Sequence, residues 1–257
     1  MDSVVALYKK AGETPLMCLQ RWQERHPECK HLPATYAGRL DPLAEGVLIV
    51  LYGDTVQQKG SYLSQEKEYE VEVLFGFSSD TGDVLGIPHT SQTKTFSTQL
   101  ELEQLLSKVL PKYIGVQTQP YPAYSSKTVQ GRPLHWWARE NRIHDISIPS
   151  REIVIQKIHT LSYQSYTAPE LLMRIEQKIS LVRGDFRQEE ITNAWRALLK
   201  DTNANQFWAV TLSVTSSAGA YMRSLAERLG REVCKDGLAL SILRTRVGSY
   251  TIDQTEK

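Results

Sequence analysis

Residues 38–52 read Gly-Arg-Leu-Asp-Pro-Leu-Ala-Glu-Gly-Val-Leu-Ile-Val-Leu-Tyr, a loop with one aspartate that runs directly into an apolar segment. The segment Val47–Tyr52 is the longest purely apolar run of the chain, and its length suits a buried strand. It is far shorter than the ~20 residues that a membrane-spanning helix needs. Taken alone, Asp41 and Pro42 predict the start of a helix, with the aspartate as N-cap and the proline at the first helical position.

Outward from this strand, helical and strand patterns are interspersed along the chain. Residues 67–75 place tyrosine, valine and phenylalanine on one face and glutamates on the other, which predicts a half-buried strand that ends in the turn-rich stretch 78–83. A helix is expected to begin at Pro15, and Ser97 or Thr98 is expected to cap another. The remaining expectations are helices at 136–139, 188–200 and 221–229, and strands at 153–155, 172–182, 207–215 and around 247–252. Without strict βαβ alternation, this pattern predicts an α+β fold with a mixed sheet.

The composition excludes several classes of protein. The 257 residues include 30 Lys and Arg against 29 Asp and Glu, which excludes a strongly basic, tail-type nucleic-acid binder, although the arrangement of charges can still create a local basic patch. Three cysteines, an odd number, argue against a disulfide framework. Cys29 and His31 supply half of a zinc site, and no second pair follows at ligand spacing. Since the N-terminus has no apolar signal segment, we expect a soluble, cytoplasmic protein.

Three residues are candidates for chemistry, and each also has a plain structural interpretation. Asp41 is either a reactive carboxylate or a helix cap. Arg223 follows Gly219, which allows a tight turn from strand to helix; an arginine in the first helical turn is disfavoured by the helix dipole, so it is either a solvated side chain or the partner of a nearby carboxylate. Tyr69 either fills the core or stacks on a nucleotide base. The residues alone leave these alternatives open.

Six segments, in order and at compatible spacings, resemble the tRNA pseudouridine synthase B (TruB) family over most of the chain. They are Lys9–Pro15, Gly38–Gly46, Lys67–Tyr69 with Asp80–Asp83, Pro122–Lys127 through Gly131 to Arg139, Gly219–Leu225, and Leu243–Gly248. The resemblance implies the pseudouridine synthase fold, in which helices flank an extended mixed or antiparallel sheet with a central catalytic cleft.

The same resemblance implies that the chain isomerises uridine to pseudouridine at position 55 in the T arm of tRNA. Asp41 would be the nucleophile, either at C1′ of the ribose or at C6 of the base, and Arg223 would keep it ionised and aimed. Tyr69, the third catalytic residue, would stack on the target base and could carry the C5 proton. The residues expected to bind substrate are Tyr36, Tyr221, Leu243, Lys9, Lys127 and Arg244. An isomerisation needs no cofactor or metal, and the expected partner is the T arm of tRNA, with no membrane and no second subunit.

Three positions depart from the family pattern. Tyr36 stands where the family has a histidine that helps to flip the base out of its stack, Arg39 replaces a threonine, and Lys10 replaces a proline. Because an aromatic ring can fill the vacated stack but carries no positive charge, a tRNA-folding chaperone with weak or no catalysis remains the alternative. With Arg39, this segment is similar to the His-Arg-Leu-Asp motif of ribosomal-RNA pseudouridine synthases. The similarity leaves open that the substrate is a different RNA.

The domain organisation follows from the same comparison of motifs. We expect one catalytic domain over residues 1–257, with an insertion around 164–206 and without the C-terminal PUA domain that bacterial members often have. The insertion either adds RNA-binding surface or is a neutral loop elaboration, because surface insertions are tolerated thermodynamically.

Overall fold

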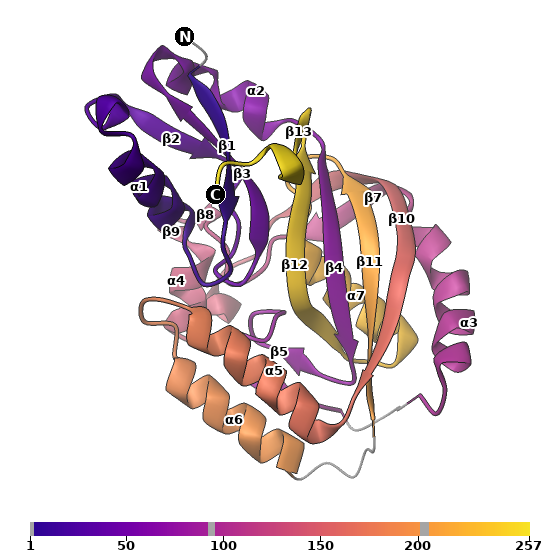
Figure 1. Cartoon of the computed structure of the whole chain (residues 1–257). Coiled ribbons are helices and arrows are strands. Elements are labelled where there is room, and N and C mark those ends of the chain that lie inside the picture. The colour runs from indigo at the N-terminus through magenta and orange to yellow at the C-terminus, as the bar shows by residue number, and fades with distance from the viewer. Residues whose placement is uncertain (1–2, 92–95, 201–205) are drawn as a thin grey trace.

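The computed structural model describes residues 3–91, 96–200 and 206–257, and a nine-stranded sheet forms its centre (Figure 1). The strand order is β1-β3-β12-β4-β11-β10-β7, with β2 paired to β3 and β13 paired to β12. The strands are β1 Val4–Lys9, β2 Ala34–Ala37, β3 Glu45–Tyr52, β4 Lys67–Phe75, β7 Gly115–Pro120, β10 Ser150–Tyr166, β11 Phe207–Ser216, β12 Gly237–Val247 and β13 Tyr250–Thr251. Since β12 runs parallel to β3 and antiparallel to β4, the sheet is mixed, which confirms the predicted α+β class.

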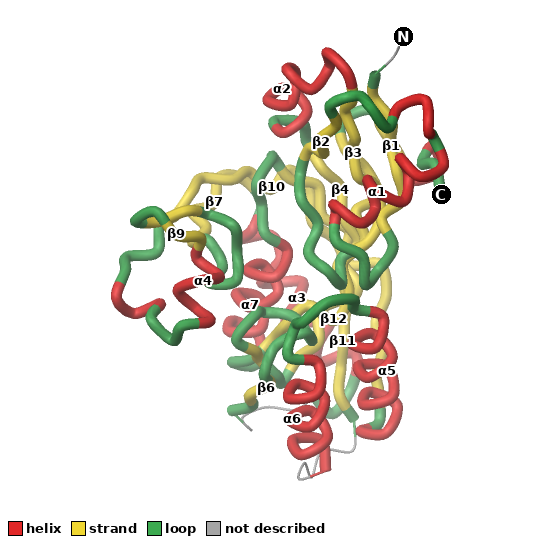
Figure 2. The backbone as a smooth tube through the Cα atoms, turned by 90° about the vertical axis from the view of Figure 1, so that its left-hand side faces the viewer, coloured by secondary structure: helices red, strands yellow, loops and turns green. Residues whose placement is uncertain are grey.

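Helices cover both faces of the sheet (Figures 1 and 2). The helices are α1 Pro15–Arg25, α2 Lys59–Leu63, α3 Gln99–Val109, α4 Leu134–Arg139, α5 Ala168–Leu181, α6 Gln188–Lys200 and α7 Met222–Val233. Apolar side chains of α3 and α7 share a core with Val71 and Val73 of β4, whereas those of α5 and α6 share a core with Leu74 of the same strand. Two short hairpins complete the fold: β5 Ser78–Ser79 with β6 Pro88–His89, and β8 Thr128–Val129 with β9 Arg132–Pro133.

The apolar run Val47–Tyr52 lies in the buried strand β3, as predicted. Its residues from Val47 to Leu51 are completely buried, because β3 is covered on both faces. Leu48 and Val50 pack against α1, and Ile49 packs on the other side with Val247 at the end of β12. The loop before β3 contains no helix, so the interpretation of Asp41 as a helix cap is wrong.

The strand expected at 172–182 is wrong, because those residues lie in helix α5. Thr167 caps this helix and exchanges hydrogen bonds with Glu170 in a capping box. Leu171, Ile175 and Ile179 recur every four residues and are buried against the sheet. This helix also explains why β4 is buried on both faces near its end, where a half-buried strand was expected.

The order of elements at the C-terminus also differs from the expectation. Helix α7 continues through Gly230 to Val233, and the long strand β12 precedes the residues 247–252 where the final strand was expected. Gly230 permits this continuation because it packs directly on Gly237: a Cβ at Gly230 would lie 2.1 Å from the backbone nitrogen of Gly237.

The expected insertion corresponds to the helical pair α5 and α6, which lie side by side (Figure 1). Residues 201–205, near the end of the insertion, lie outside the described residues. Searched over its described residues, the chain has no helix that is long and apolar enough to cross a membrane.

Candidate active site

A cavity of about 1050 Å³ opens between the sheet, the loop 38–44 and the tip of the α5–α6 pair. Its size lies at the upper end of the range of about 300–1000 Å³ that is typical of small-molecule sites. Eight Lys and Arg side chains line it against two Asp, although the whole chain has a formal net charge of only +1. The basic charge of this near-neutral protein is therefore concentrated at the cavity, as an anionic ligand requires.

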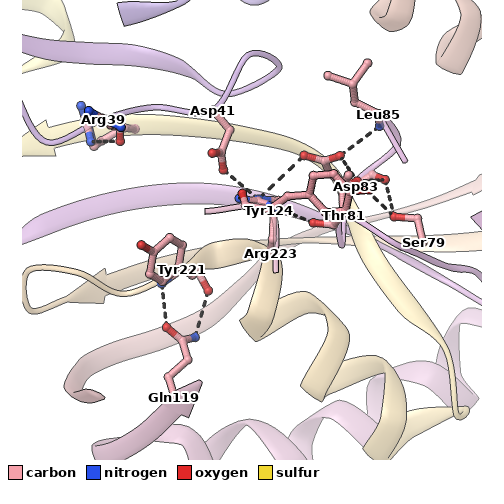
Figure 3. Close-up of polar contacts among 11 residues, drawn as sticks. Arg39, Asp41, Ser79, Thr81, Asp83, Leu85, Gln119, Tyr124, Tyr221 and Arg223 are labelled. Atoms are coloured by element: carbon pink, nitrogen blue, oxygen red, sulfur yellow. Dashed lines mark hydrogen bonds and ion pairs between the residues drawn. The ribbon is translucent and has the colours of Figure 1, made fainter. Parts of the chain in front are cut away.

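Asp41 and Arg223, far apart in the sequence, meet in this cavity (Figure 3). Arg223 Nε donates a hydrogen bond to Asp41 Oδ2 at 2.8 Å, and the arginine side chain is 3% exposed whereas that of the aspartate is 38% exposed. The guanidinium group is held from the far side by the carbonyl oxygens of Thr81, at 2.5 Å, and Tyr124, at 3.2 Å. The arginine is thus fixed by the protein, while the carboxylate faces the open cavity.

A second aspartate shares the same arginine. Asp83 Oδ2 lies 3.8 Å from Arg223 Nε, and its carboxylate also accepts bonds from the Thr81 hydroxyl and the Leu85 backbone N–H (Figure 3). Burial raises the pKa of the Asp83 carboxyl, and the charge of Arg223 opposes that rise. Burial by itself would lower the pKa of Arg223, but the charges of Asp41 and Asp83 outweigh it, so the pKa of this guanidinium is raised.

Two buried cations hold the loop that carries Asp41. Lys9 Nζ donates to the carbonyl oxygens of Pro42, at 3.0 Å, and Ala44, at 2.5 Å. Arg244 donates to the carbonyl oxygens on the other arm of the loop, Gly38 at 2.9 Å and Arg39 at 3.4 Å, and to that of Val47 at 2.8 Å.

Both cations were expected to bind substrate, and the structure shows what else they contact. Lys9 is absent from the described lining of the cavity, and it is completely buried. Arg244 reaches the cavity wall but is 1% exposed and directs its donors at the loop. Burial lowers the pKa of Lys9 to about 8. Both residues position the loop that carries Asp41.

Tyr69 and Tyr221, which were expected at the site, both line the cavity. Tyr69 projects from β4 and is 8% exposed. Tyr221 stands at the start of α7, where its backbone N–H donates to Gln119 Oε1 at 2.8 Å and its carbonyl oxygen accepts from Gln119 Nε2 at 3.0 Å (Figure 3). Burial, followed by the charge of Asp41, raises the pKa of Tyr221, which keeps the phenol neutral. The side-chain amide of Gln119 thus fixes the backbone at Tyr221, two residues before Arg223.

The other three expected substrate contacts have different positions. Tyr36 lines the cavity from β2, and Lys59 Nζ lies 5.7 Å from the centre of its ring. Lys127 is exposed and lies over the ring of Tyr121, which packs edge-on against Tyr221. Leu243 is not among the described residues of the lining, whereas Ile242, the preceding residue of β12, is.

Several lining residues were not identified from the sequence. Asp83 belongs to the turn motif 80–83, but no local signal separates it from its neighbours. Phe186 and Arg187, at the tip of the α5–α6 pair, also line the cavity. Arg187 Nη2 donates to Asp80 Oδ2 at 2.8 Å and its guanidinium lies 5.3 Å from the ring centre of Tyr124. These contacts join segments that are far apart in the sequence, 107 residues in the case of Arg187 and Asp80, so the sequence carries no short-range sign of them.

Metal ligation has no support among the residues that the structure describes. Across ranges 3–91, 96–200 and 206–257, no group of three or more His, Cys, Asp or Glu side chains is arranged to hold an ion. Cys18 and Cys234 are buried as free thiols, and Cys29 is half-buried. The polar groups at the cavity therefore have their hydrogen bonds and ion pairs with other groups of the protein.

Comparisons with known proteins agree on one family. Residues 29–181 match the family model for the N-terminal domain of TruB family pseudouridylate synthases. The chain is 25% identical over 255 residues to tRNA pseudouridine synthase B of Limosilactobacillus reuteri, covering 99% of this chain and 70% of that protein. It is 28% identical over 286 residues to tRNA pseudouridine synthase 4 of Schizosaccharomyces pombe, covering 91% of this chain and 68% of that protein.

Solved structures share the fold. The crystal structure of a Cbf5-Nop10-Gar1 complex matches with a TM-score of 0.56 at 16% identity, and an H/ACA RNP bound to a substrate RNA containing 2′-deoxyuridine matches with a TM-score of 0.53 at 14% identity. Each match covers 97% of this chain and about half of the other, 50% and 49% respectively. At this level of identity the likeness concerns the arrangement of the sheet and helices.

Proposed function

We propose that this chain, which belongs to the TruB family of pseudouridylate synthases, isomerises uridine to pseudouridine at position 55 in the T arm of tRNA. One observation carries the proposal: a half-exposed carboxylate, Asp41, faces a large basic cavity and is held at 2.8 Å by a buried arginine that the protein fixes from behind. A protein that only binds RNA has no need for a carboxylate that faces its binding site, because the carboxylate repels the phosphate groups of the RNA.

In the proposed reaction, the C1′–N1 glycosidic bond breaks, the uracil turns, and a C1′–C5 bond forms. The proton on C5 leaves and N1 gains one, so the reaction needs no oxidant, reductant or group donor. Asp41 acts as nucleophile at C1′ or at C6, and Arg223 aims it through a charge-assisted bond. Tyr69 lies against the base and carries the C5 proton. Tyr221 and Ile242 line the same space, which supports a pocket that excludes water.

The target base must leave its stack to reach such a cavity, at a cost of a few kcal/mol. Tyr36 lines the cavity and can fill the vacated stack. The missing charge of the family histidine has a candidate replacement in Lys59, whose ammonium group lies 5.7 Å from the Tyr36 ring centre. This pair supports catalysis over the chaperone alternative.

Tritium release from tRNA transcripts labelled at uridine C5 tests the proposed function. The hydrogen on C5 must leave when C5 becomes the glycosidic carbon, so one equivalent should be released per tRNA. A transcript with cytidine at position 55 should release none. Release from that control as well would point to another uridine or another RNA, and binding without any release would favour the chaperone.

A further inference from the structure

Arg151, the second residue of β10, projects into the cavity beside the turn that leads to Arg223. Its Nη2 donates to the carbonyl oxygen of Ala218 at 3.1 Å. The guanidinium group lies directly on Gly219, since a Cβ at that glycine would stand 1.8 Å from Arg151 Nη1. Gly219 also has a φ of +84°, which favours glycine. The turn therefore leaves room for the arginine and keeps it in one place.

This guanidinium group has spare hydrogen-bonding capacity. An arginine has five N–H donors, and Arg151 Nε is buried without a hydrogen-bond partner. Among the described residues, Arg151 forms no ion pair with a carboxylate. Buried donors are nearly always satisfied, and an exception calls for a ligand or an ordered molecule at the site.

A second cation, which has no carboxylate partner within the described part of the chain, stands close by. Lys67, at the start of β4, is 4% exposed, lines the same cavity and donates to the carbonyl oxygens of Leu63 and Gln65. Burial, followed by the charges of Arg244 and Arg151, lowers the pKa of Lys67 to about 8. The charges of Arg244 and Arg151 thus act unfavourably on the Lys67 ammonium group, and an anion bound at Lys67 would relieve that repulsion.

We propose that Arg151 and Lys67 bind one phosphate group of the RNA backbone next to the uridine at Asp41. The inference rests on the proposed function, which supplies a polynucleotide as ligand. An arginine suits this role because its planar fork of donors matches a phosphate, and in Arg151 only Nη2 is engaged, by Ala218, while among the described residues Nη1 has no hydrogen-bond partner. The backbone would then be clamped on one side of the reacting nucleotide, which orients the base toward Asp41.

A methylphosphonate scan tests this assignment. Each phosphate near the target uridine of a T-arm RNA is replaced in turn by a neutral methylphosphonate, and binding is measured for the wild type, for Arg151→Gln, and for the control Arg231→Gln on the exposed part of α7. In the wild type and in the control, one position should weaken binding by about 10- to 100-fold, since hydrogen bonds between charged groups have that worth. In Arg151→Gln that same position should have a much smaller effect, because only the contact with Lys67 remains. Arg151→Lys should restore part of the penalty, because it restores the charge without the fork.

The outcomes separate the two proposals. Turnover by the wild type with the same penalty pattern in Arg151→Gln, or with no penalty at any neighbouring phosphate, would overturn the phosphate site and leave the isomerase standing. Absence of both turnover and RNA binding in the wild type would overturn the proposed function and the phosphate site together. Thermal unfolding of Arg151→Gln and Arg151→Lys identifies a folding defect, and the scan is then read on the variant that folds.

Discussion

Arg223 is the residue on which the candidate site depends, because it joins three separate segments. Its guanidinium group contacts Asp41 and Asp83 and the carbonyl oxygens of Thr81 and Tyr124. A lysine has three donors around a single point and cannot serve four acceptors placed around a planar fork. The position of the Asp41 carboxylate is therefore encoded mainly in one side chain from α7.

Arg223→Lys should lower kcat by about 100-fold, because a misplacement of reacting groups by about 1 Å costs that much. KM should change much less, since most RNA contacts remain. Single-turnover kinetics on a labelled tRNA give the comparison. The matched control is Arg231→Lys, on an exposed position of the same helix. Equal rates for both variants would mean that the Arg223 contacts do not aim Asp41.

The burial of Lys9 leads to a prediction about how the stability of the protein depends on pH. Its pKa is lowered from 10.5 to about 8 by burial, so the folded protein binds fewer protons than the unfolded chain between these values. Stability should rise with pH through this window, by about 3 kcal/mol at most from this group, and should show no pH dependence from it below the window. Denaturant unfolding at several pH values should show a smaller rise in Lys9→Met than in the wild type, because the variant keeps only the contribution of other buried lysines such as Lys67. Identical slopes in the two proteins would contradict the buried, easily deprotonated lysine.

Among the helices and strands, the elements that were predicted correctly are those whose starts or burial depend on neighbouring residues in the sequence. Pro15 begins α1, Thr98 caps α3, and the apolar run of β3 is a buried strand, all as expected. The failure at α5 has a physical reason: its apolar residues are dense enough to suggest a strand, and the capping box at Thr167 was the overlooked sign of a helix.

The site residues also fall into two groups: those that sequence motifs identify and those whose roles depend on the completed fold. Asp41, Tyr69 and Arg223 were identified through motifs, and the fold brings them to one cavity. The roles of Lys9 and Arg244 could not be predicted, because a buried cation and a ligand-binding cation look alike in sequence. Gln119 is 102 residues from Tyr221, and only the completed sheet brings its amide to that backbone.

The α5–α6 pair yields a prediction of its own, because its tip lines the cavity. Arg187 contacts Asp80 and Tyr124, and the carbonyl oxygen of Tyr124 supports Arg223. Arg187→Ala should lower kcat/KM by about tenfold, the usual worth of a charged hydrogen bond. The control is Arg196, which lies at an exposed position of α6 and forms an ion pair with Glu176. Arg196→Ala should leave kcat/KM unchanged. Similar values for the two variants would make the pair a neutral elaboration.

At the scale of the whole molecule, the arrangement of charge matters more than its sum. A chain with a formal net charge of +1 gathers eight Lys and Arg at one cavity, and the composition alone could not locate them. The cavity opens where the loop before β3, which carries Asp41, meets the start of α7. This arrangement suits an extended anionic ligand.

RNA affinity should therefore fall as salt rises. Each phosphate contact releases counterions and contributes roughly −0.7 to −0.9 to the slope of log K against log salt. Filter binding of tRNA between 50 and 300 mM salt (roughly the range in which such slopes are linear) gives the number of contacts. A flat response would contradict binding of a nucleic acid at this cavity.

The central claim is that Asp41 performs chemistry and does not merely complete a binding site. Asp41→Asn keeps the shape of the side chain and removes its charge, and Asp54→Asn, at an exposed position outside the described lining of the cavity, is the matched control. Tritium release and tRNA affinity are measured on the same preparations. The account predicts release by wild type and Asp54→Asn, none by Asp41→Asn, and tRNA binding retained in all three. Full release by Asp41→Asn would contradict it.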